Sequence, residues 1–103
     1  MTLTDYQKLN NCDLDAIAAE SEGWVTIPRY CTSRDLAYEF RKGFTPEEHS
    51  KYGTELARII NGPDCTLEKL LFESSAQEFV RKMADASARD QMIAAIMVKK
   101  GEV

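Results

Sequence analysis

Hydrophobic residues recur at intervals of three and four positions along most of the chain, which is the spacing of an amphipathic α-helix. The pattern predicts helices over residues 13–22, 34–42, 46–60 and 88–100, with a turn or short helix within 3–11. In the last of these helices the apolar stripe consists of Met92, Ile93, Ile96 and Met97. Most of the chain is therefore expected to be helical.

Capping residues mark the ends of these helices. The clearest signal is Thr45-Pro46-Glu47-Glu48, in which Thr45 caps, Pro46 occupies the first helical position and Glu48 completes a capping box. Further capping residues are Ser33 and Ser87 at helix starts, and Gly23, Gly43 and Gly101 at helix ends. These signals fix where the predicted helices begin and end.

Two segments do not follow the helical pattern clearly. Trp24-Val25-Thr26-Ile27 is β-branched and aromatic, which favours a strand, and Pro28 would end it or place it at a sheet edge. The segment 66–86 suits a helix by spacing, although 78–86 also reads as a strand. The choice between helix and hairpin for 66–86 stays open.

Charge and composition exclude several classes of protein. The net charge is −4, residues 1–23 hold five acidic side chains against one basic, and no basic stripe of the kind that binds nucleic acid is present. The acidic N-terminal part could meet a basic partner, but a solvated face is the more common explanation. No apolar run is long enough to span a membrane, and the first residues lack the features of a signal peptide, so a cytoplasmic location is expected.

The residues that could carry chemistry are few. Three cysteines without a CxxC pair are expected to be reduced, and a single histidine leaves too few ligands for a structural zinc site, so no metal or cofactor is expected. The chain contains neither dinucleotide-binding nor P-loop, zinc-protease or nucleophile-elbow motifs, so it is not expected to be an enzyme. The remaining catalytic alternative uses Cys31 and His49, although a buried thiol and a surface histidine are the more common roles.

The densest group of binding-type side chains lies between the first two longer helices. It comprises Trp24, Arg29, Tyr30 and Arg34, and aromatic and arginine side chains are enriched at binding hot spots. An arginine beside aromatic rings could also hold a phosphate or a nucleobase. The opposing interpretation places Trp24 and Tyr30 in the core and the arginines in water.

Three short pieces of the chain occur in this order: Leu14–Glu20 followed by Gly23-Trp24, then Ile27–Ser33 leading into a helix, then Ala84–Ser87 leading into Ile93-Ala94-Ala95. Together they resemble a family of small tailed-bacteriophage proteins, the phage ABA-sandwich domain. The resemblance covers about half the chain. It implies a small sheet, a phage origin and an accessory role, and it implies no catalytic residues. The well-capped helix 46–60 departs from the family pattern.

From the resemblance we predict an α+β fold in which helices pack on a small antiparallel sheet, and residues 1–103 are expected to form a single domain. Local signals alone favour the alternative, an all-α bundle of four to five helices. An apolar stripe on helix 46–60 or on the last helix could support a homo-oligomer, or it could be core.

The expected function is a non-enzymatic phage accessory protein, a counter-defence inhibitor that binds a host immune protein in the manner of an anti-CRISPR. The first alternative is an oligomeric sponge that binds a nucleotide signal through Trp24, Arg29, Tyr30 and Arg34. The second is a small enzyme that uses Cys31 and His49.

Overall fold

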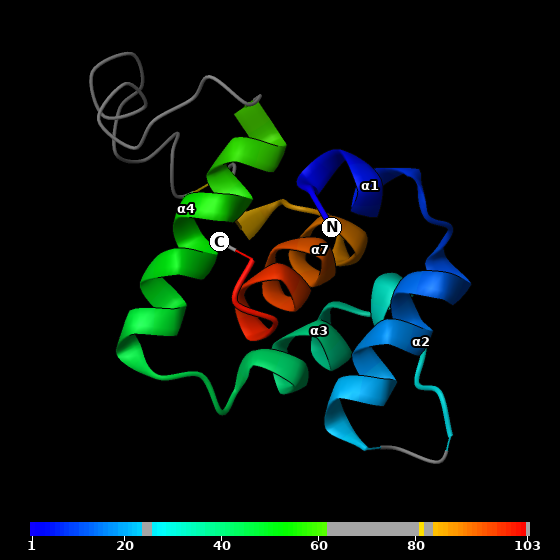
Figure 1. Cartoon of the computed structure of the whole chain (residues 1–103). Helices are drawn as coiled ribbons and strands as arrows, with labels where there is room; N and C mark the ends of the chain where they lie inside the picture. The colour runs from blue at the N-terminus through cyan, green and yellow to red at the C-terminus, as the bar shows by residue number, and fades with distance from the viewer. Residues whose placement is uncertain (24–25, 62–80, 82–83, 103) are drawn as a thin grey trace, which may run out of the picture.

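The computed structural model describes residues 1–23, 26–61, 81 and 84–102 (Figure 1). Over these residues the regular structure is helical, and no strand is present. The elements are α1 (Leu3–Lys8), α2 (Asn11–Glu22), the 3₁₀ turn η1 (Tyr30–Thr32), α3 (Arg34–Arg41), α4 (Pro46–Asn61) and α7 (Ala88–Lys99). The predicted α+β fold is therefore wrong, and the all-helical alternative fits the part of the chain that the structure describes.

Helix α7 forms the centre of the molecule. It contacts α1, α2, η1, α3 and α4, and Figure 1 shows these elements arranged around it. Every residue from Gln91 to Val98 is buried. Between Met92 and Val98 the sequence contains no polar side chain, so the helix has no face that prefers water, and a helix that is apolar all round belongs in an interior.

The surrounding helices each contribute one apolar face to this core. Tyr6 of α1, Leu14 of α2 and Leu56 of α4 are at most 2% exposed. The rings of Tyr30 and Phe40 meet edge to face, with their centroids 5.6 Å apart. The predicted apolar stripes of the last helix and of helix 46–60 thus pack in or against the core, which agrees with the core interpretation of these stripes.

The predicted helix ends are largely confirmed. The backbone N–H of Glu48 donates to Oγ1 of Thr45 (3.2 Å), and that of Thr45 donates to Oε1 of Glu48 (3.0 Å), which is the capping box. Gly23 adopts the left-handed conformation with φ of 71° and ends α2. Helix α2 begins at Asn11, two residues before the predicted start at residue 13, and its N-cap is Asn10.

The predicted strand at 24–27 is not found in the part that the structure describes. Trp24 and Val25 lie outside the described residues, while Thr26 and Ile27 are exposed and belong to no ladder. The physical reason is the lack of a partner, because β-branched residues stabilise a strand only when a neighbouring strand pairs with it. The nearby amide of Cys31 donates instead to the side chain of Asp15 (2.9 Å).

The ambiguous segment 66–86 lies almost entirely outside the described residues. Within it, Arg81 and Ala84 are helical, and the backbone N–H of Asp85 donates to the carbonyl of Arg81 at 2.9 Å, as in an α-helical turn. These residues give no support to a strand over 78–86.

Arg89 fastens the N-terminal helices to α7. Its guanidinium donates to the carbonyls of Leu9 (2.6 Å) and Gln7 (3.0 Å) and to Oδ1 of Asn11 (2.8 Å). These acceptors lie at the junction of α1 and α2, where a helix end leaves carbonyls without internal partners. One side chain of α7 therefore supplies hydrogen bonds to the acceptors at the junction of two other helices.

Replacing Arg89 by Gln should lower the free energy of unfolding by roughly 2–3 kcal/mol, because hydrogen bonds from a charged donor are lost and partly buried acceptors remain. Urea denaturation followed by circular dichroism measures the change. Arg29→Gln is the matched control, since Arg29 is exposed and should change stability by less than about 0.5 kcal/mol. Equal effects of the two substitutions would show that Arg89 does not hold the helices together.

Candidate functional site

The residues that the sequence grouped as a binding cluster do not form one site among the described residues. Tyr30 is 4% exposed and packs against Phe40 in the core. Arg29 is exposed before η1, and Arg34 is exposed at the start of α3. Trp24 lies outside the described residues. For Tyr30 the structure agrees with the core interpretation, and the exposed arginine side chains remain as candidates.

Cys31 is held in a buried environment beside α2. The residue is 5% exposed, and its backbone N–H donates to Oδ1 of Asp15 at 2.9 Å. Burial, followed by the hydrogen bond and the negative charge of Asp15, raises the pKa of the Cys31 thiol to about 12. The thiol therefore stays protonated near neutral pH, which is the opposite of what a nucleophilic cysteine requires.

His49 lies in a different setting. It is exposed in the first turn of α4, and its ring centroid is 5.8 Å from that of Phe44. No hydrogen bond within the described residues joins it to Cys31. The structure thus gives no support to a catalytic Cys31–His49 pair.

The outer face of α3 carries the most prominent exposed aromatic group of the described structure. Arg34, Tyr38, Arg41 and Lys42 share one side of this helix, at spacings of four, seven and eight residues. We call these four residues the α3 face. Tyr38 is 55% exposed, whereas Leu36, Ala37 and Phe40 on the opposite side contact the core. A large aromatic ring in water, flanked by basic side chains, therefore distinguishes this helix.

Arg41 fixes the position of this face. Its guanidinium lies 5.6 Å from the ring centroid of Tyr38 and 4.8 Å from that of Tyr52, so it is stacked between helices α3 and α4. Its Nη1 donates to Oε1 of Gln91 at 3.0 Å, and Nε2 of Gln91 donates to the carbonyl of Ala86 at 3.0 Å. Gln91 is buried in α7, so the Arg41 side chain that contacts Tyr38 is bonded to a residue of the core.

Arg34 connects α3 by a hydrogen bond to the segment before α7. Its Nη2 donates to the carbonyl of Asp85 at 3.1 Å. The two successive carbonyls of Asp85 and Ala86 are therefore held by Arg34 of α3 and by Gln91 of α7. The start of α7 and the outer face of α3 form one connected polar network.

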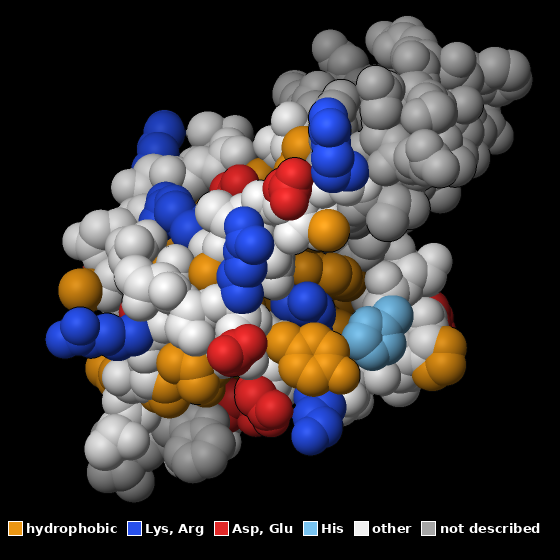
Figure 2. Space-filling view, turned by 180° about the vertical axis from the view of Figure 1, so that it is seen from behind, with side chains coloured by type: hydrophobic (Ala, Val, Ile, Leu, Met, Phe, Trp, Pro, Cys, Tyr) orange, Lys and Arg blue, Asp and Glu red, His pale blue; other side chains and the backbone are white. Residues whose placement is uncertain are grey.

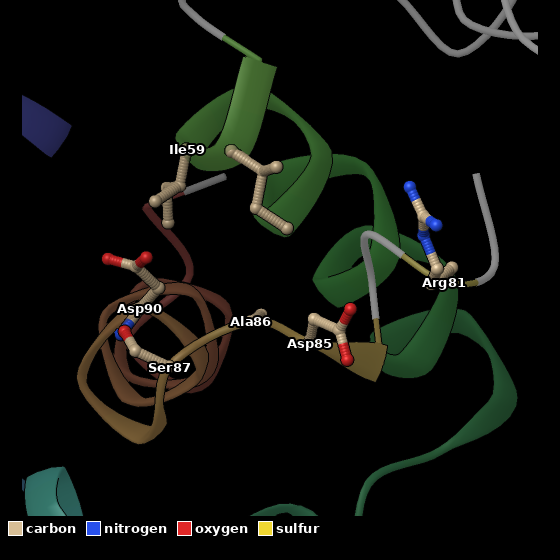
Figure 3. Close-up of a pocket in the computed structure, with 7 residues that line it drawn as sticks. Ile59, Arg81, Asp85, Ala86, Ser87 and Asp90 are labelled. Atoms are coloured by element: carbon tan, nitrogen blue, oxygen red, sulfur yellow. The ribbon is translucent and has the colours of Figure 1, made fainter. Parts of the chain in front are cut away.

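A pocket of about 480 Å³ adjoins this network (Figure 3). Its lining consists of Ile59, Ile60, Arg81, Asp85, Ala86, Ser87 and Asp90. Figure 3 shows Ile59 and Asp90 at one end and Asp85 and Arg81 at the other. The described lining combines apolar, acidic and basic side chains, and the pocket lies beside the carbonyl of Asp85 that Arg34 contacts.

Surface charge is mixed on the face opposite to that of Figure 1. Figure 2 shows lysine and arginine side chains spread among acidic and hydrophobic ones, without gathering into a stripe. Among the described residues, no group of three or more His, Cys, Asp or Glu side chains could hold a metal ion. Within the same residues, no helix has the length and apolar content needed to cross a membrane.

Comparison with protein-family models, with curated proteins and with solved structures found no match for this chain. The designations as a phage protein and as an anti-CRISPR, which followed from the family resemblance, find no support in these comparisons. The α+β designation made with it is wrong because the described residues contain no sheet.

Sequence reasoning missed two features of this region. Tyr38 was not singled out and Arg41 was interpreted only as part of an exposed basic pair with Lys42, although the spacing of Arg34, Tyr38 and Arg41 places all three on one side of a helix. Asp15 was assigned to a solvated face, yet it is 5% exposed and accepts the Cys31 amide. The residues around Asp15 do not indicate that it is buried, because its hydrogen-bond partner Cys31 is distant in the sequence.

Site-resolved alkylation tests the description of Cys31. At pH 8 iodoacetamide should modify the exposed Cys12 readily and Cys31 at least about 100-fold more slowly, because thiolate is the reactive form and burial raises the pKa of Cys31. Mass spectrometry of tryptic peptides gives both rates, and urea should make them similar. Equal rates in the folded protein would contradict a buried, protonated Cys31.

Proposed function

We propose that the protein acts by binding a partner protein through the α3 face, without catalysing a reaction. The observation that carries this proposal is the exposed ring of Tyr38, held by the guanidinium of Arg41 at 5.6 Å. Tyrosine and arginine are among the residues most enriched at interface hot spots. An exposed pair of this kind, ordered before binding, is what a recognition surface requires.

The energetic argument is preorganisation. Ordering a side chain upon association costs about 0.5–1.5 kcal/mol for each side chain rich in rotamers. Arg41 is already fixed by Gln91 and Tyr52, and Arg34 by the carbonyl of Asp85. Binding a partner through these groups therefore costs less side-chain entropy than binding it through free surface arginines. More of the contact energy then remains as free energy of binding.

The chemistry of the face indicates an acidic contact on the partner. Tyr38 is flanked by the cations of Arg34, Arg41 and Lys42, and the carboxylate nearest in sequence, Glu39, lies 4.0 Å from Lys42. Carboxylates of a partner could pair with these cations while an apolar group covers the ring. Such complementarity governs the rate and orientation of association more than its strength.

The other functions expected from the sequence either lack an observation in their favour or are untested. The nucleotide-sponge alternative assigned base stacking to Tyr30, whose ring is covered by the core, so no observation favours it over protein binding. Inhibition of a host immune protein and a cytoplasmic location remain predictions of the sequence that no finding tests.

Site-specific photocrosslinking in the cells that naturally make the protein tests the proposal. p-Benzoylphenylalanine at position 38 keeps an aromatic ring on the α3 face and should yield one dominant crosslinked protein. The same group in place of Ser50, which is exposed on α4, is the control and should not capture that protein. The crosslinked peptide of the partner should contain Asp or Glu.

Charge reversal of Arg34 supplies the quantitative prediction. Arg34→Glu should lower the affinity for the captured protein at least about tenfold, whereas Lys51→Glu on the exposed side of α4 should change it less than about twofold. Surface plasmon resonance with the purified pair measures both. Capture from position 50 as strong as from position 38, or equal effects of the two reversals, would overturn the proposal.

A further inference from the structure

A second pocket, separate from the α3 face, opens where the ends of four helices meet. Its volume is about 250 Å³, and residues from the ends of α2 and α7, the second half of α3 and the start of α4 line it. Three of the lining side chains are the carboxylates of Glu22, Glu39 and Glu48, and two are the rings of Phe40 and Phe44. The pocket thus combines aromatic walls with a negative rim.

The chain already places one ammonium group in this pocket. Nζ of Lys99 lies 4.9 Å from the ring centroid of Phe40 and pairs with the carboxylate of Glu22. Attraction of a cation to an aromatic face adds to ion pairing, and its strength increases where water is partly excluded. The position of Lys99 indicates that an ammonium group suits the aromatic and acidic lining of this pocket.

The charges of the pocket are not balanced by that one ammonium. The lining holds three carboxylates and the one ammonium of Lys99; Glu48 accepts the backbone N–H of Thr45 (3.0 Å), and Glu39 is exposed and 4.0 Å from Lys42, which lies outside the lining. Two negative charges therefore remain in excess among the lining side chains. A further cation would lower the electrostatic energy of the group.

The geometry favours an elongated organic cation over a metal ion. The three carboxylates do not converge on a common point, since the described residues hold no group of three acidic side chains close enough to share a metal. Phe40 and Phe44, whose ring centroids are 6.4 Å apart, supply an apolar wall along which methylene groups could lie. An alkyl chain that ends in an ammonium matches both features.

We infer that the pocket formed by Glu22, Glu39, Phe40, Phe44 and Glu48 binds a lysine side chain of a partner protein. The ammonium takes the excess negative charge of Glu39 and Glu48, and the methylene groups lie against Phe44. Lys99 competes with the incoming lysine for Glu22 and Phe40. This inference does not depend on the α3 face, because it uses different side chains.

Titration of the ¹⁵N-labelled full chain with Nα-acetyl-lysine methylamide tests the pocket directly. The backbone amides of Gly43 and Phe44 should shift, with a Kd on the order of 1 mM, as is typical of one charged side chain. The matched control ligand carries an acetyl group on Nε, which removes the charge, and it should bind at least about tenfold more weakly.

Substitutions at Lys99 and Glu39, with one at Glu47 as control, separate specific recognition from general attraction of cations. Lys99→Ala should tighten binding several-fold, because it removes the resident ammonium, and Lys99→Gln should do the same if the alanine variant fails to fold. Glu39→Gln should weaken binding several-fold. Glu47→Gln, on an exposed carboxylate of the same first turn of α4 that does not line the pocket, is the control and should have no effect.

Three results would each overturn the inference. The first is equal shifts with the charged and the acetylated ligand, and the second is no gain in affinity upon removal of the Lys99 ammonium. The third is tighter binding of free cadaverine than of the blocked lysine, since this would assign the pocket to a small diamine rather than to a protein side chain.

Discussion

The burial of α7 on all of its sides is the constraint on which the rest of the structure depends. A helix whose residues Gln91–Val98 are all covered needs apolar surface in every direction around its axis, and α1, α2, η1, α3 and α4 supply it. Each of these elements needs to be apolar on one side only. Their outward sides are consequently free for polar groups, and the candidate binding features lie there.

A buried central helix also makes its few polar residues important. Gln91 and Arg89 lie near the start of α7 and form hydrogen bonds with other elements. Gln91 accepts a hydrogen bond from Arg41 of α3, and Arg89 donates hydrogen bonds at the junction of α1 and α2. Because unmet polar groups in an interior are costly, these pairs determine how the outer helices sit around α7. The order of the α3 face follows from the same arrangement, since Arg41 connects Gln91 to Tyr38.

Local signals in the sequence determined most of the helices, whereas the fold class was predicted wrongly. Thr45, Ser33 and Ser87 act within a few residues, so their effect could be seen without a structure. The sheet was expected from a resemblance and from the β-prone run at 24–27, which could form a strand only with a partner that the described residues do not provide. Contacts distant in sequence, such as Asp15 with Cys31 and Arg41 with Gln91, left no local trace. The proposed binding role of Tyr38 depends on such contacts, so it could not be predicted from the sequence alone.

Native-state hydrogen exchange tests the central position of α7 most directly. The amides of Met92 to Val98 should exchange only through global unfolding, with protection equal to the free energy measured by urea denaturation, while those of α1 and α3 should exchange through smaller openings. Exchange of the α7 amides as fast as those of α3 would show that the molecule is not organised around a buried central helix.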